Sequence, residues 1–127
     1  MGKVIEKLKL TNAFEPSRTI EVNAVVDTGA TMLVIPLSIA RKLKLRKMRE
    51  VQARYADGHV CSKPVYGVVT AEVMGRAGEF DVLVEENGHQ PLIGQILLEQ
   101  LDLIVNPKKW TLIPNPQSPD MPMVEVL

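Results

Sequence analysis

Residues 23–31 read Asn-Ala-Val-Val-Asp-Thr-Gly-Ala-Thr, and the rest of the chain is organised around them. The apolar residues before Asp27 are typical of the buried end of a strand. Gly29 indicates a tight turn or a close approach of backbone. Asp27 is therefore expected where a rigid strand ends, and functional residues tend to lie in turns that a stiff scaffold positions. Asp-Thr-Gly between two apolar runs is also an ordinary turn pattern, so the rest of the chain has to decide.

Composition narrows the class of protein. The chain has 127 residues, enough for one domain with its own core, and its 15 basic and 15 acidic residues give no net charge. This balance disfavours a nucleic-acid partner, which usually requires a strong basic bias. Cys61 is the single cysteine, so no intrachain disulfide is possible and a reducing, cytoplasmic location is expected. We see no secretory h-region and no apolar stretch of about 20 residues, so we expect no membrane partner.

Short strands dominate the pattern along the chain. Ala56-Asp57-Gly58-His59 lies between two strand-like runs and predicts a hairpin with an exposed, mobile tip. Many short strands with regular turns are typical of an all-β barrel or sandwich, here with one or two short helices. Alternation predicts strands over 4–10, 19–26, 32–35, 51–55, 60–74, 79–85, 103–105 and 110–113, turns over 11–18 and 75–78, and helices over 37–45 and 96–101.

The C-terminal segment differs in composition from the rest. Four prolines fall within residues 114–127, which predicts an extended tail after a domain of residues 1–113. Residues 123–127 are strand-like, and they either pair with a second chain or fray. Trp110, just before the tail, is expected in the core.

Three features of the sequence line up in order and spacing. They are the apolar run ending in Asp27-Thr28-Gly29-Ala30, the hairpin tip at Tyr55-Ala56-Asp57-Gly58, and Leu92-Ile93-Gly94 before a short apolar helix. Together they resemble the retropepsin-like aspartic proteases of clan AA, which are single-domain, retroviral-type enzymes with many bacterial relatives. The resemblance covers residues 19–113, implies a relative of the bacterial type, and predicts the all-β, closed-barrel-like acid protease fold.

The resemblance implies an aspartic endopeptidase that acts as a homodimer on peptide or protein substrates, without metal or cofactor. Each chain gives one aspartate, Asp27, to a dyad that activates water. Residues 55–60 resemble the flap that closes over an extended peptide, and the C-terminal tail could enter the dimer interface. The residues that the resemblance assigns are Asp27, Thr28 and Gly29 for catalysis, Ala30, Thr31, Tyr55, Ala56, Asp57 and Gly58 for substrate binding, and Leu92, Ile93 and Gly94 as a structural motif.

The sequence also departs from the family pattern. Thr31 and Gln95 stand where retroviral members often carry a charged pair, and Ile96 stands where many relatives have a helix-capping Asn or Asp. Ala30 cannot donate the hydrogen bond that Ser or Thr would give the carboxylate, so we expect a pH optimum nearer neutrality than in pepsin-like enzymes. The missing charged pair leaves open a second reading, a non-catalytic peptide-binding module with the same fold.

Two further classes are disfavoured. His59, His89 and Asp27 show no recognisable metal-ligand spacing, and glycine-rich phosphate loops are absent from the sequence. A nucleophilic Cys61 assisted by His59 has no evident group to orient the histidine.

Overall fold

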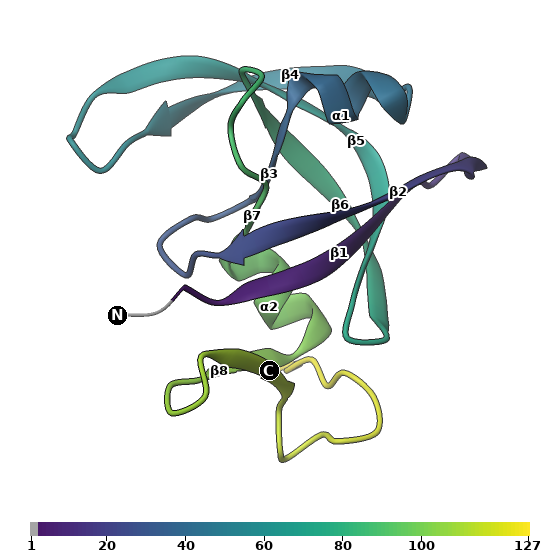
Figure 1. Cartoon of the computed structure of the whole chain (residues 1–127), viewed down its shortest axis with the longest axis vertical. Helices are drawn as coiled ribbons and strands as arrows, with labels where there is room; N and C mark the ends of the chain where they lie inside the picture. The colour runs from purple at the N-terminus through teal and green to yellow at the C-terminus, as the bar shows by residue number, and fades with distance from the viewer. Residues whose placement is uncertain (1–2) are drawn as a thin grey trace.

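The computed structural model describes residues 3–127, and strands make up most of it (Figure 1). Seven strands form one sheet in the order β1-β2-β7-β3-β6-β5-β4, and two more form a separate pair. The strands of the main sheet are β1 (Ile5–Asn12), β2 (Glu15–Val26), β3 (Leu33–Pro36), β4 (Arg46–Arg54), β5 (Val60–Val73), β6 (Arg76–Glu85) and β7 (Leu92–Ile93). The remaining elements are helices α1 (Leu37–Lys42) and α2 (Gln95–Leu101) and the pair β8 (Leu103–Asn106) and β9 (Thr111–Pro114).

The main sheet curls back on itself. β5 pairs with β4 and β6 over most of its length, and its far end also pairs with β1, from Lys9 opposite Glu72 to Asn12 opposite Val69. This extra pairing closes the sheet into a ring, and in Figure 1 the β1–β2 ribbon crosses the β5–β6 ribbon. A closed sheet leaves few free edges and encloses its inward side chains. The fold is the all-β, closed-barrel-like retropepsin fold that the sequence predicts.

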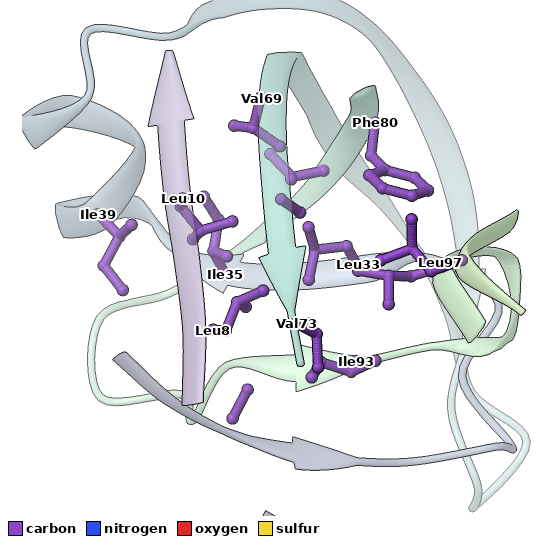
Figure 2. Close-up of a cluster of buried hydrophobic side chains, with 14 of the residues drawn as sticks. Leu8, Leu10, Leu33, Ile35, Ile39, Val69, Val73, Phe80, Ile93 and Leu97 are labelled. Atoms are coloured by element: carbon purple, nitrogen blue, oxygen red, sulfur yellow. The ribbon is translucent and has the colours of Figure 1, made fainter. Parts of the chain in front are cut away.

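The inside of the ring is filled by alternate residues of the strands. Leu8 and Leu10 of β1 are fully buried, as are Ile35 of β3 and Val69 of β5. Figure 2 shows these side chains converging with Phe80 and with residues of α1 and α2. Successive side chains of a strand point to opposite faces, so every second residue enters the core. This core holds in place the strand ends from which the loops project.

The β4–β5 hairpin extends beyond the closed sheet. The β5–β6 ladder runs to Val65 opposite Leu83, whereas β5 continues back to Val60 paired with β4 alone. The tip beyond these strands turns with a hydrogen bond from the Gly58 amide to the Tyr55 carbonyl, 2.8 Å long, and Gly58 has a positive φ of 90°. A hairpin at Asp57-Gly58 is therefore confirmed, and residues 56–59 are exposed.

The C-terminal segment is held against the body of the protein through Asp102, which ends α2 in the left-handed region with φ 56°. Its carboxylate accepts hydrogen bonds from the side chains of Asn115 and Ser118 and from the Met123 amide. The buried Arg76 guanidinium donates to the carbonyls of Leu101, Asp102 and Ser118. Residues 116–121 thus form turns and bends rather than a fully extended segment, and residues 123–127 form no strand within one chain.

Two predicted turns are wrong in their extent. The turn between β1 and β2 is only Ala13–Phe14. The Asn12 side chain accepts a hydrogen bond from the Phe14 amide at 2.9 Å, which closes the turn within two residues, so both strands extend further than predicted. The turn between β5 and β6 is Met74–Gly75, with φ of 53° and 78°, which is the two-residue geometry that matches strand twist. Arg76 therefore already belongs to β6.

Two predictions about single elements are also wrong. The first helix ends at Lys42 rather than at residue 45, because Lys44 is left-handed (φ 51°) and turns the chain so that Leu43 and Leu45 enter the core. Trp110 is not a core residue, since 42% of it is exposed. Its amide donates to the Asn106 carbonyl at 2.9 Å and its φ is 53°, so it closes the β8–β9 turn and faces outward.

Candidate active site

Asp27 follows directly on β2, at the side of the molecule on which the β4–β5 hairpin also projects (left in Figure 1). The residue is exposed, while its backbone is fixed. Its amide donates to the Ile93 carbonyl at 2.9 Å, and its carbonyl accepts from the Ala30 amide at 3.1 Å. One carboxylate oxygen accepts from the Gly29 amide at 2.9 Å, which orients the side chain within its own turn. The geometry presents an accessible carboxylate on a rigid support.

The strand that delivers Asp27 is stiffened by β7. Val25 and Val26 lie in parallel register with Leu92 and Ile93, and the Val25 amide donates to the Pro91 carbonyl at 2.9 Å. β7 is also paired with β3 on its other side, so it lies between the strands that enter and leave the Asp27 loop. Leu92-Ile93 therefore fixes both ends of the Asp27 loop through its hydrogen bonds to the two flanking strands.

Gly94 and the start of α2 contact the other side of the loop. A Cβ atom on Gly94 would lie 2.4 Å from the Met32 carbonyl oxygen and 2.8 Å from that of Ala30, so only glycine fits there. The amides of Gln95 and Ile96 donate to the carbonyls of Ala30 and Thr31, at 2.8 and 3.0 Å. The loop thus folds over the amino end of α2 and satisfies two of its free amide groups.

This arrangement corrects the expectation that Ile96 marks a lost helix cap. The N-cap position is Gly94, and Ile96 is the second residue of α2, so its side chain was never in a position to cap. The contact also shows what joins the two motifs in this chain, where Thr31 and Gln95 replace charged residues. The link consists of backbone hydrogen bonds, while the Gln95 side chain donates within its own helix, to Glu99 at 3.2 Å.

A hollow of about 400 Å³ opens beside the Asp27 loop. Thr31 and Met32 line it from the loop and Ile96 from α2. Arg49 of β4 and Asp81 of β6 also line it, and Arg49 donates to Asp81 at 3.0 Å. Arg49 and Asp81 carried no signal in the sequence, because they are ordinary charged residues within strands that the fold brings together.

The hairpin tip has its own polar arrangement. The Tyr55 and His59 rings are stacked, with centroids 4.4 Å apart and planes 5° from parallel. Asp57 accepts from the amide and the ring nitrogen of His59, and these hydrogen bonds lower the pKa of the Asp57 carboxyl. Within residues 3–127 no hydrogen bond joins this tip to the Asp27 loop, so the structure shows no direct polar link between the two predicted parts of the site.

The base of the hairpin contains a buried charge that the sequence does not reveal. Glu85 is only 7% exposed, and one carboxylate oxygen accepts from the Tyr55 hydroxyl at 2.5 Å. The other oxygen lies 2.8 Å from the Lys63 ammonium. Burial alone would raise the pKa of Glu85, but the hydrogen bonds from Lys63 and Tyr55 outweigh it and hold that pKa below its usual value. Burial and the Glu85 carboxylate together raise the pKa of the Tyr55 hydroxyl.

Residues 3–127 hold no group of three or more His, Cys, Asp or Glu side chains placed to bind a metal ion. Over the same residues, no helix has both the length and the apolar character needed to cross a membrane.

Comparison with known proteins places the chain in a family. Residues 18–107 match the model of the family described as "gag-polyprotein putative aspartyl protease". No curated protein matches the sequence. The matched segment contains the Asp27 loop, the β4–β5 hairpin and the Leu92-Ile93-Gly94 motif. The chain therefore belongs to this retropepsin-like aspartyl protease family.

Proposed function

We propose that the chain is an aspartic endopeptidase that works as a homodimer, with Asp27 of each protomer forming one catalytic dyad. The observation that carries the proposal is the Asp27 loop itself. Its carboxylate is exposed while its backbone is tied to β7 and packed against Gly94. A single chain supplies one such aspartate, and a two-fold axis beside the loop would bring a second copy to it.

The chemistry follows from the proximity of two carboxyl groups. Two carboxylates that are close together cannot both ionise easily, so the pair keeps one proton. The ionised carboxylate takes a proton from a water molecule between them, and the water oxygen attacks the peptide carbonyl carbon. The protonated carboxyl donates its proton to the carbonyl oxygen. As the C–N bond of the tetrahedral intermediate breaks, the carboxyl that took the water proton gives it to the leaving amine nitrogen. The other carboxylate takes a proton from one hydroxyl of the intermediate, which becomes the product carboxyl group, and the dyad again holds one proton.

The neighbouring residues have roles in the same proposal. Thr28 would hydrogen-bond across the two-fold axis. Gly29 would let substrate backbone approach, because a Cβ atom added there would lie 3.2 Å from an Asp27 carboxylate oxygen and would crowd the space beside it. The hairpin tip at Ala56 to Gly58 would close over an extended peptide and exclude water. The hollow at Thr31 offers room for a substrate side chain. A cytoplasmic location remains part of the proposal and is supported by the single cysteine.

The test compares Asp27→Asn with Asp120→Asn, the same change on an exposed aspartate of the tail. Each protein digests a broad peptide library over pH 4 to 8, with products read by mass spectrometry and dimer mass by sedimentation. We expect wild type and Asp120→Asn to cleave the same bonds and Asp27→Asn to cleave none. Cleavage by Asp27→Asn would exclude the dyad, and peptide binding without cleavage by wild type would favour the binding module.

Mixing the two proteins tests the shared site directly. When wild type and Asp27→Asn are mixed equally and exchange protomers, about a quarter of the dimers carry Asp27 on both sides. Activity per wild-type chain should therefore fall to about half. Activity that stays unchanged at every mixing ratio, under conditions where sedimentation shows dimers, would refute a dyad built from two chains.

A further inference from the structure

The inference concerns Glu85, which lies where the β4–β5 hairpin leaves the closed sheet. The β5–β6 ladder stops at Val65 opposite Leu83, and two residues further along the same register Lys63 faces Glu85. β6 is held by β5 on one side and by β3 on the other, where Pro36 lies opposite Glu85. Glu85 therefore belongs to the fixed part of the sheet, while the segment that it contacts projects beyond it.

Glu85 contacts both sides of the projecting hairpin. Lys63, on β5, lies 2.8 Å from one carboxylate oxygen, and the Tyr55 hydroxyl, just beyond β4, donates to the other at 2.5 Å. The Lys63 and Glu85 side chains are only 17% and 8% exposed. Charge-assisted hydrogen bonds in such a sheltered setting are stronger than those on the surface. The hairpin is thus tied to the sheet at two points by one side chain.

Further contacts link Tyr55 to the tip of the hairpin. The Tyr55 ring stacks on the His59 ring, and His59 in turn contacts Asp57. A chain of contacts therefore runs from Glu85 in the sheet to the outermost residues of the hairpin. A hollow of about 420 Å³ lies alongside this chain of contacts, with Tyr55, His59 and Lys63 on the hairpin side and residues 86–89 on the other.

We propose that Glu85 is a positioning residue, which through Lys63 and Tyr55 sets the angle at which residues 54–60 stand relative to the Asp27 loop. This rests on the proposed function, in which the hairpin covers a bound peptide. We call the contacts of Glu85 with Lys63 and Tyr55 the clamp. A hairpin already held at the angle needed for binding loses less conformational freedom when the peptide binds, so the clamp favours substrate binding more than the chemical step. Loss of the clamp should therefore raise KM and change kcat little.

The experiment compares Tyr55→Phe with Ser62→Ala. Tyr55→Phe removes the hydroxyl and leaves a ring that can still stack on His59. Ser62→Ala removes a hydrogen bond of the same hairpin, from Ser62 to Glu50 at 2.8 Å, that is exposed and does not reach β6. For Tyr55→Phe we expect KM about tenfold higher, kcat within about twofold, and hydrogen exchange at the amides of residues 55 and 58 about tenfold faster. Ser62→Ala should match wild type in all three.

A second pair of variants guards against a general loss of structure. Lys63→Met should reproduce the changes in KM and hydrogen exchange seen in Tyr55→Phe. Lys63→Arg, which keeps the charge, should have the KM and exchange rates of wild type. Unchanged exchange in Tyr55→Phe would overturn the clamp, and faster exchange with unchanged KM would overturn its role in positioning. If wild type cleaves no peptide, the proposed function fails and the positioning role fails with it, whereas the exchange measurement still decides whether the clamp exists.

Discussion

Replacing Gly94 by alanine tests whether the Asp27 loop depends on its contact with α2. The added methyl group would lie 2.4 Å from the Met32 carbonyl oxygen and 2.8 Å from that of Ala30. Both neighbours are backbone atoms, so no side chain can rotate away to make room. Ordinary contact is about 3.5 Å, and the loop would have to withdraw by about 1 Å.

The size of the effect follows from what that shift breaks. The hydrogen bonds from Gln95 to Ala30 and from Ile96 to Thr31 are 2.8 and 3.0 Å long, and an added 1 Å puts both beyond hydrogen-bonding distance. Each lost bond costs about 1 kcal/mol, and overpacking adds about 1–3 kcal/mol. We expect the free energy of unfolding to fall by about 3–5 kcal/mol, and Tm by about 10–20 °C.

Urea unfolding monitored by circular dichroism measures this change, with an unchanged m-value as the sign that both proteins unfold alike. Gly78→Ala is the matched control. Its methyl group would meet the end of the flexible Gln100 side chain at 2.8 Å and two apolar side chains at 3.3 Å. These neighbours can move, so we expect a loss below about 1 kcal/mol. Equal stability losses in the two variants would refute the argument that Gly94 fixes the loop. Peptide cleavage, assayed well below Tm, should fall in Gly94→Ala alone.

Three further predictions follow from single contacts. Arg76→Met should lower the free energy of unfolding by about 3 kcal/mol in urea, because it leaves three carbonyls near the end of α2 without their donor; a loss below about 1 kcal/mol would contradict this. Because the pKa of Glu85 is lowered when folded, its pairing with Lys63 stabilises the protein above about pH 4.3 and is lost as pH falls further. The stability difference between wild type and Lys63→Met should therefore be constant from pH 6 to 9 and shrink below about pH 4. Ala30→Ser should move the pH optimum of cleavage to lower pH if Ala30 lies beside the dyad, and an unmoved optimum would count against that placement.

Features that depend on neighbours along the chain could be predicted from the sequence. Apolar alternation predicted the strands, and Asp-Gly predicted the hairpin. The pattern around Asp27 and the later Leu92-Ile93-Gly94 were sufficient to indicate the family. Turn extents were less accurate, as at Met74-Gly75, because the residues that end a strand depend on what the partner strand does.

Features that join residues far apart in the sequence could be seen only in the folded chain. Glu85 looks in the sequence like one more polar residue in an alternating strand, yet it is buried because Tyr55 and Lys63, 30 and 22 positions away, meet it there. The closing contact of β1 with β5 and the anchoring of the tail at Asp102 are of the same kind. The physical reason is that a charged group becomes tolerable inside a protein only when its partners arrive, and those partners are supplied by the closure of the sheet rather than by adjacent sequence.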